Sequence, residues 1–460
     1  MTRSVGRLAL AATLVTLAPP GLAAQQAGAM PRLPVQKFTL PNGLEVILHE
    51  DHSVPLVTVN VWYKVGSSDE QPGRTGFAHL FEHVMFMGSQ NVPVGKYDEW
   101  LEAVGASPNG STSQDRTNYY QGGSSTALPL MLWLEADRMG ALLPTMSQDK
   151  LDVQRDVVKN ERRQSYDNVP YGRAWETILR TLYPLQHPYS WPVIGSMEDL
   201  SAASLADVNS FFRMYYAPNN ASVSIAGDFA PDSARAWVTR YFGAIPRGPA
   251  MPPRPMIADA RVVRDTAIML EDRVQLPRVY WAWHTARAFH PDDAALDLLA
   301  YVLAGDKNSR LYKRLVYDLQ VAQSVGARQS SGRLAGSFLV DVTPRPGQDP
   351  SAVARIVEEE ISRLATGGVT EEEMTRARNT FLSRMLNSLA SVQGKADQLQ
   401  YYNYFVGTPD YVQEDAARYA SARAEDVQRV ARQYLSESKV LLTVVPQGKP
   451  EMMVQMGAGN

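Results

Sequence analysis

The sequence predicts an α+β protein, and the order of its strands and helices is the first evidence. Period-2 stretches in FTLPNGLEVILHE (38–50) and PLVTVNVWYKVG (55–66) indicate strands, and Asn42-Gly43 is a turn signal that joins the first pair. The other elements expected are helices at about 74–87, 126–142, 148–166 and 203–216, and strands around 107–124 and 219–227. Antiparallel strands mixed with helices are typical of the α+β class.

A proline-rich stretch near the middle of the chain indicates two domains. PRGPAMPPRPM (246–256) interrupts the pattern of elements where a linker is expected. On either side of it, DVNSFFRMYYAPNNASVSIAG (207–227) and DVQRVARQYLSESKVLLTVVP (426–446) share a helix-then-strand layout, which predicts a duplicated domain. Chance similarity between two amphipathic units is the alternative. The expected segments are an N-terminal domain at 31–245, a linker at 246–256 and a C-terminal domain at 257–460.

The first residues have the layout of a cleaved secretory signal. Basic residues precede an apolar run (8–17), and prolines and small residues close the segment by residue 24. The run is shorter than the roughly 20 apolar residues that a membrane span needs, which disfavours the alternative of an anchor. We therefore expect residues 1–24 to be removed on export, with the bacterial periplasm as destination and no membrane span in the mature chain.

The net charge and the absence of cysteine exclude some functions and some kinds of metal site. Lys+Arg total 45 and Asp+Glu total 48, a formal charge of -3, so no global field attracts a polyanion such as nucleic acid. The chain has no cysteine, which excludes disulfides and thiolate metal ligands. A metal site must therefore use histidines and carboxylates.

The segment TGFAHLFEHVMFMG (75–88) contains three residues with metal-site spacing. His79 and His83 are four positions apart, so on a helix both imidazoles can point at one ion. Glu82 falls on the same face, where it can reach a water at the metal. Most other positions are apolar, and in such a buried helix ionisable groups cost free energy unless they are paired or metallated. A pair of hydrogen-bonded core histidines is the alternative.

Glu161 is the candidate for a third ligand, because catalytic zinc usually takes three protein ligands and leaves one position for water. In SQDKLDVQRDVVKNERRQSYD (147–167), Glu161 lies one turn beyond Val157, Val157 lies one turn beyond Val153, and Val158 adjoins the same side. The glutamate is therefore expected to extend an apolar helix face. An ordinary buried or capping carboxylate is the alternative.

HLFEH followed by this glutamate resembles the inverted-motif zinc peptidases, the pitrilysin family that includes insulysin and the mitochondrial processing peptidases. Further blocks agree with that family over essentially the whole mature chain: GASPNGSTSQDRTNYY, LEADRM, RDVVKNE, HPYSWPVIG and YYAPNNASVSIAGD. The resemblance implies two homologous α/β-sandwich domains that face each other like a clam. It also implies one zinc per chain, held by His79, His83 and Glu161, with Glu82 as general base.

The resemblance also implies residues that bind substrate. The segment 107–113 matches an edge strand to which an extended peptide adds as a further strand, which makes Asn109 and Ser111 backbone binders; an ordinary turn is the alternative. Ligating imidazoles need acceptors on their other nitrogens. Glu135 and Asp137 of LEADRM are candidates for that second shell, with pairing to arginines as the alternative.

Two departures from the family affect the expected function. Gln154, another candidate near the site, stands where members often carry an acidic residue seven positions before the ligand glutamate. Val316 and Gln323 stand where active relatives place an arginine and a tyrosine that hold the substrate and the oxyanion. We expect a zinc endopeptidase acting on short or unfolded peptides, with a related partner chain that supplies the arginine–tyrosine pair. A homodimer, a non-catalytic subunit of a two-chain assembly and a non-peptide hydrolase are the alternatives.

Overall fold

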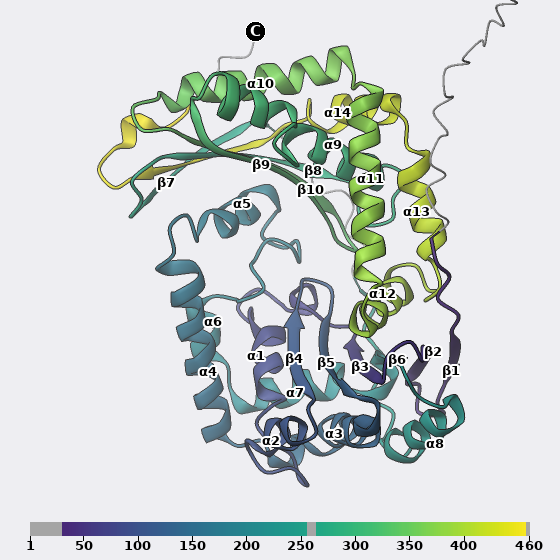
Figure 1. Ribbon diagram of the computed structural model, residues 1–460. Coiled ribbons are helices and arrows are strands. Elements are labelled where there is room, and N and C mark those ends of the chain that lie inside the picture. Colours follow the sequence, from purple (N-terminus) through teal and green to yellow (C-terminus); the bar gives the residue numbers. More distant parts are fainter. Residues whose placement is uncertain (1–29, 255–263, 457–460) are drawn as a thin grey trace, which may run out of the picture.

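The computed structural model describes residues 30–254 and 264–456, and the predicted signal segment 1–24 lies outside them. Figure 1 shows two layered units stacked so that their sheets face each other, with most helices on the outer faces. In the described part of the chain, no helix combines the length and apolar character needed to cross a bilayer.

The first sheet has six strands in the order β1-β2-β6-β3-β5-β4. Its strands are β1 (Gln36–Thr39), β2 (Glu45–Glu50), β3 (Leu56–Tyr63), β4 (Ser107–Thr112), β5 (Thr117–Ser124) and β6 (Ala221–Gly227). The predicted turn between β1 and β2 forms at Asn42-Gly43, where Gly43 has a φ of 98° that favours glycine. Only β2 and β6 pair in parallel, and β4 pairs with β5 alone, which leaves β4 at the edge of the sheet.

The two faces of this sheet differ in polarity because side chains alternate along each strand. Val57, Val59 and Val61 of β3 are fully buried in a core formed with the outer helices. The helices of this half are α1 (Phe77–Val84), α2 (Lys96–Ala103), α3 (Leu128–Ala141), α4 (Gln148–Arg162), α5 (Ala174–Leu182), α6 (Met197–Ala202), α7 (Leu205–Tyr215) and α8 (Pro231–Phe242). The side chains of Asn60 and Ser222 face the other way, toward the second half of the chain: Asn60 Nδ2 donates to Asp397 and Ser222 Oγ donates to Gln400.

The second sheet repeats the first. Its strands, in the order β7-β11-β8-β10-β9, are β7 (Thr266–Asp272), β8 (Arg278–Thr285), β9 (Ala322–Ser331), β10 (Gly336–Pro344) and β11 (Val440–Pro446). This is the strand order of the first sheet without β1, and again only one pair, β7 and β11, is parallel. Its helices are α9 (Asp293–Ala304), α10 (Pro350–Gly367), α11 (Glu371–Ser388), α12 (Val392–Phe405), α13 (Val412–Ser421) and α14 (Ala424–Tyr434). The predicted fold of two related α/β units is confirmed.

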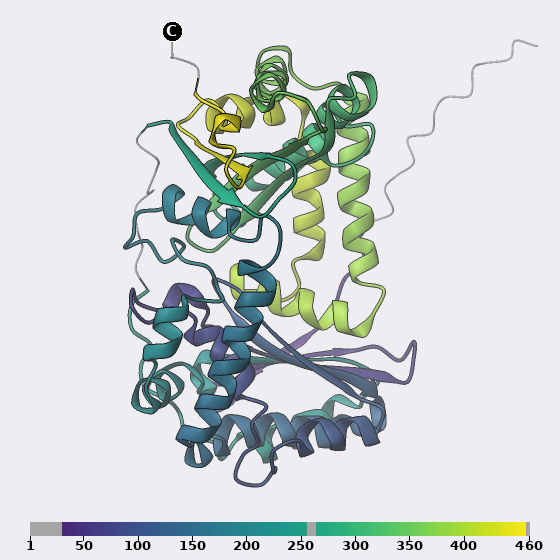
Figure 2. The same ribbon diagram turned by 90° about the vertical axis from the view of Figure 1, so that its left-hand side faces the viewer.

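Each half contributes one helix to the inner face of the other half's sheet. Helix α5 packs on β8 and β11, with Ile178 and Leu182 buried against Leu442. Helix α11 runs down from the second half toward the first, and α12, which follows it, lies across β3 and β6 (Figure 2). The space between the sheets is therefore bounded by both halves of the chain.

Candidate metal centre

Helix α1, which carries the predicted histidines, is short and is held by tertiary contacts. Gly76 precedes it with a φ of 87°, and the buried carboxylate of Glu70 accepts hydrogen bonds from Gly76 N at 3.0 Å and from Ala78 N at 2.8 Å. These backbone N–H groups have no partner within the helix, so Glu70 acts as its cap. Burial raises the pKa of Glu70 well above its ordinary value. Near the other end, Tyr119 Oη donates to Phe81 O at 3.1 Å.

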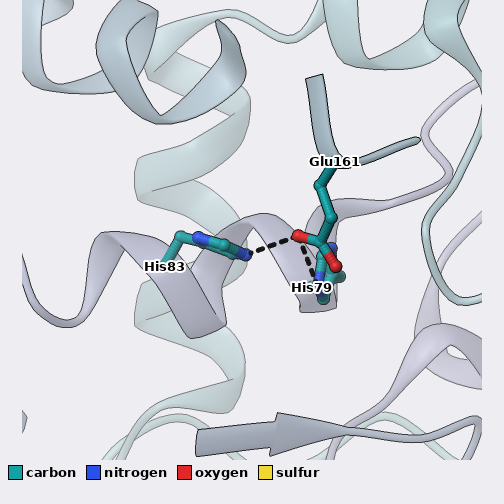
Figure 3. Close-up of side chains that lie close together, drawn as sticks. All are labelled: His79, His83 and Glu161. Carbon is teal, nitrogen blue, oxygen red and sulfur yellow. Dashed lines mark ion pairs between the residues drawn. The ribbon is translucent and has the colours of Figure 1, made fainter. Parts of the chain in front are cut away.

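The structure brings His79, His83 and Glu161 together, as the sequence predicts (Figure 3). Glu161 Oε2 lies 3.2 Å from His83 Nε2 and 3.6 Å from His79 Nε2. One ligand atom from each residue lies within 4.8 Å of the other two, and the described residues hold no second cluster of this kind. Helices α1 and α4, which are far apart in the sequence, pack directly on each other to create it.

The chemistry of these three side chains fits a divalent metal such as zinc. Burial lowers the pKa of His79 to about 4, so its imidazole is neutral near pH 7, the form that binds a metal. The hydrogen bond with His83 lowers the pKa of Glu161, which keeps this carboxylate ionised. Two imidazole nitrogens and one carboxylate oxygen form a donor set that catalytic zinc uses.

Glu82 lies beside the cluster and points toward the edge strand. Its Oε2 accepts a hydrogen bond from Thr112 Oγ1 at 2.7 Å. A Cβ at Gly110 would lie 3.0 Å from Glu82 Cγ, so the glycine permits this close approach to β4. Burial raises the pKa of Glu82 above its ordinary value, which makes the carboxylate a stronger base.

The predicted peptide-binding residues lie on β4. Asn109 is exposed, and its Oδ1 accepts from Gly110 N at 2.8 Å. Ser111 O is already occupied, because Arg116 Nη1 donates to it at 2.8 Å and to Ser111 Oγ at 2.6 Å. Sequence reasoning missed Arg116. It directly precedes β5, two positions before Asn118, and this spacing was the available signal, because residues two apart along a strand share a face.

The apolar face that led to Glu161 from the sequence does not form as expected, although Glu161 does lie beside the two histidines. Val153 and Val157 are 53% and 41% exposed, whereas Val158 is fully buried, so the apolar face of α4 does not run through the first two. Gln154, seven positions before Glu161, lies on the same side of the helix. Its Nε2 contacts Met87 Sδ at 2.7 Å, which gives it a packing contact in place of the predicted second-shell role.

The second-shell roles predicted for Glu135 and Asp137 are also wrong. Glu135 is fully buried, forms an ion pair with Arg138 and accepts from Gln121 Nε2 at 2.6 Å. Asp137 accepts from Asn91 Nδ2 at 2.6 Å and from a neighbouring serine hydroxyl. Both carboxylates therefore bond to side chains of their own domain and not to the ligand imidazoles. Among the described residues, His79 Nδ1 is buried without a hydrogen-bond partner.

The two positions at which the resemblance led us to look for an arginine and a tyrosine, Val316 and Gln323, both lie in the described part of the second half. Val316 packs against the core of the second sheet, and Gln323 is exposed on β9. Arg314 Nη2 donates to Glu359 at 2.6 Å and its Nη1 donates to Glu360 at 3.2 Å. This guanidinium is therefore engaged with two carboxylates of α10.

Comparison with known proteins places these features in a family. A model described as insulinase (peptidase family M16) matches residues 45–187, and one described as peptidase M16 inactive domain matches residues 202–381. Zinc protease PqqE of Helicobacter pylori is 29% identical over 88% of this chain and 91% of its own length. A probable mitochondrial-processing peptidase subunit beta of Arabidopsis thaliana is 23% identical over 88% of this chain and 77% of its own.

Solved structures agree with the sequence matches. A protease from Helicobacter pylori superposes with a TM-score of 0.85 at 26% identity, covering 90% of this chain and 100% of that one. A peptidase M16 inactive domain from Pseudomonas fluorescens gives 0.81 at 20% identity over 92% of this chain and 100% of its own, which shows the shared fold.

Proposed function

The chain belongs to peptidase family M16, and we propose that it is a zinc-dependent endopeptidase that hydrolyses short or unfolded peptides. One observation supports this most strongly. His79, His83 and Glu161 converge on one point while Glu82 stands between them and an open strand edge. This arrangement combines a three-ligand metal site, a base and a place for an extended substrate.

The residues divide the work of the proposed reaction. A zinc ion held by His79, His83 and Glu161, one per chain, would supply Lewis acidity that polarises the scissile carbonyl and acidifies water. Glu82 takes a proton from the attacking water and returns it to the leaving amine. The Thr112 hydroxyl, 2.7 Å from Glu82 Oε2, orients that carboxylate.

The free edge of β4 supports the substrate class. Because β4 has a strand neighbour on one side only, a peptide can pair with its other side through main-chain hydrogen bonds. Such pairing needs an extended chain, which short or unfolded peptides provide and folded proteins do not. Asn109 and Ser111 lie on this edge, adjacent to Gly110, against which Glu82 packs.

A partner chain completes the proposal. Val316 cannot donate a hydrogen bond from its side chain and Gln323 carries no charge, so a related second chain would supply an arginine–tyrosine pair across the chamber. A homodimer that uses other donors, and a weakly active subunit of a two-chain assembly, are the competing arrangements. Export to a bacterial periplasm, as the segment 1–24 predicts, is part of the same proposal.

Zinc content and peptidase activity of the purified protein test this function. We expect about one zinc per chain, cleavage of an internally quenched unstructured peptide, and loss of cleavage on chelation that zinc restores. The double variant His79→Ala, His83→Ala should lose both metal and activity. Stoichiometric zinc in that variant, or a metal-loaded protein that cleaves no peptide with or without a partner, would contradict the proposal.

A further inference from the structure

A cavity of about 540 Å³ lies between the two sheets, next to the end of β4. Its walls come from both halves of the chain, and they include Trp62 on β3, Ser111 on β4, Trp175 on α5 and Tyr401 on α12. Most of this lining is aromatic or hydroxyl-bearing. Three charged side chains, Asp115, Arg116 and Asp397, also line it, and Arg116 is the cation among them.

The guanidinium of Arg116 is fixed in place, and no described carboxylate touches it, although Asp397, Glu82 and Asp115 lie near enough to act on its charge. Its Nη1 donates to Ser111 O and Oγ and to Asn118 Oδ1 at 2.8, 2.6 and 3.0 Å, and the group lies over the Trp62 ring, 5.2 Å from its centroid. Within the described parts of the chain, Nε and Nη2 make no hydrogen bond, and no carboxylate lies within 4.0 Å of the group.

A half-buried arginine without a carboxylate partner is unusual, because a desolvated cation costs free energy unless it is paired. Burial lowers the pKa of Arg116, although a guanidinium stays protonated in proteins. The two carboxylates that line the cavity have other partners: Asp397 accepts from Asn60 Nδ2 at 2.5 Å, and Asp115 accepts from Tyr189 Oη at 2.7 Å and from Arg333 N at 2.9 Å. The Nε–Nη2 edge of Arg116 therefore has the fork geometry that binds a carboxylate with two parallel hydrogen bonds.

We propose that this cavity is a subsite for an acidic side chain of the bound peptide, and that Arg116 selects it. The proposal rests on the proposed peptidase function and specifies its substrate class. Glu82 packs on Gly110, and Ser111, the next residue, holds Arg116. Since a strand rises about 3.3 Å per residue, the selected aspartate or glutamate lies within about three residues of the scissile bond. Its side chain points toward the inner face of the first sheet.

Binding measured without hydrolysis separates this subsite from the catalytic proposal. The inactive variant Glu82→Gln, loaded with zinc, is titrated by fluorescence anisotropy with labelled peptides that differ only by Glu or Gln at each position flanking the scissile bond. We expect one position at which Glu binds about tenfold or more tightly than Gln, the size of a charge-assisted hydrogen bond. The same ratio is then measured as kcat/KM in the parent protein.

Three further substitutions in the Glu82→Gln background test the assignment. Arg116→Gln should bring the Glu/Gln ratio close to one, whereas Asp397→Asn should raise it, because the anion that opposes the incoming carboxylate is removed. Arg376→Gln is the matched control: Arg376 Nη1 lies 2.7 Å from Glu372 and neither residue lines the cavity, so the ratio should not change. Thermal melting of each variant checks folding.

Several outcomes would overturn the subsite. They are the absence of any position with an acidic preference, an unchanged ratio in Arg116→Gln, and equal loss of Glu and Gln peptides in that variant. Equal loss would mean that Arg116 only braces the β4–β5 hairpin. A binding preference that persists while the parent protein cleaves neither peptide would refute the peptidase function and leave the subsite intact.

Discussion

Glu82 differs from the three candidate ligands in the direction of its carboxylate. The oxygens of Glu161 face the imidazoles at 3.2 and 3.6 Å, whereas Glu82 Oε2 bonds to Thr112 on the edge strand. A substitution of Glu161 should therefore weaken metal binding, because its carboxylate is one of the candidate ligands. Glu82 can be changed without touching the ligand set.

The substitution Glu82→Gln tests that division of roles. Glutamine keeps the shape of the side chain and removes its basicity, so we expect peptidase activity to fall by about 10²-fold or more while the zinc content stays near that of the parent. Metal analysis and initial rates on the same preparation measure both. Thr112→Val is a companion variant that keeps the base and removes its hydrogen bond, so it should lower peptidase activity less than Glu82→Gln does. Loss of zinc in Glu82→Gln would show that Glu82 is a ligand.

For single residues, the sequence indicated which side chains come together at the candidate metal centre, but not the hydrogen bonds that the buried carboxylates form. The spacing of His79 and His83 determines their common helix face, so this pair could be found without a structure. Glu161 required the packing of α4 on α1, and the valine pattern used to choose it includes exposed positions. Hydrogen-bond partners of buried carboxylates, such as Arg138 for Glu135, depend on side chains brought together by the fold. Periodicity does not contain that information.

Among the elements, α1 depends most on a group outside itself. It has only eight residues, too few for a stable isolated helix, and its first N–H groups bond to Glu70. This explains how three ionisable side chains remain ordered on a short helix. The helix is positioned by Glu70 and Tyr119 and not by its own propensity.

Removing the cap should loosen the metal site as well as the helix. In Glu70→Ala two buried N–H groups lose their acceptor, which should lower the free energy of unfolding by about 2–4 kcal/mol and weaken zinc binding. Glu70→Gln retains one acceptor oxygen, so its free energy of unfolding and its zinc affinity should lie between those of the parent and those of Glu70→Ala. Urea unfolding and competition with a zinc chelator measure the two effects. The exposed Glu102→Gln on α2 is the control, and a Glu70→Ala protein as stable as that control would contradict the capping role.

Element types were predicted where local patterns are strong, and boundaries were not. The helix expected at 74–87 forms only at Phe77–Val84, and its late start follows from the left-handed backbone of Gly76. The helix expected at 148–166 changes into a π-helical turn at Arg163–Asp167. The strands around 107–124 form as the hairpin β4–β5. The exchange of α5 and α12 between the two sheets was not predicted, because it depends on contacts between residues more than a hundred positions apart.

At the scale of the whole molecule, two histidines lie where the segment that follows α5 meets the second sheet. The His187 and Tyr183 rings stack with their centroids 4.5 Å apart, and the His284 ring of β8 meets Tyr183 edge-on with centroids 4.7 Å apart. His187 Nδ1 accepts a hydrogen bond from Tyr189 N at 3.0 Å, which requires the neutral ring. Burial lowers the pKa of His187 to about 4.

This contact predicts loss of stability in acid. In the unfolded chain His187 takes up a proton near pH 6.5, whereas the folded protein resists protonation until about pH 4. The unfolded state therefore binds more protons within that window, and stability falls as pH drops from 6.5 to 4. Urea midpoints measured across this range should fall less steeply for His187→Asn, which retains an acceptor for Tyr189 N. Parallel curves for the two proteins would contradict the prediction.

The side chains that the two halves present to the space between the sheets lead to a prediction about the peptidase activity of the chain without a partner. The first half presents the candidate metal ligands and base, while Val316 and Gln323 offer no cation or phenol at the positions that the family uses. Loss of one oxyanion donor typically lowers turnover by about 10²–10³-fold. We therefore expect the purified chain alone to bind zinc and to cleave an unfolded peptide poorly.

Addition of a related chain that carries the arginine and tyrosine should raise kcat by a factor of that order, with zinc content unchanged. A partner in which that arginine is replaced by glutamine should assemble equally well by light scattering and fail to stimulate. These paired measurements separate a supplied donor from simple stabilisation, because stabilisation would follow assembly whether or not the arginine is present. Full activity of the isolated chain, unchanged on addition of the partner, would instead favour a self-sufficient homodimer whose donors lie elsewhere in the chamber.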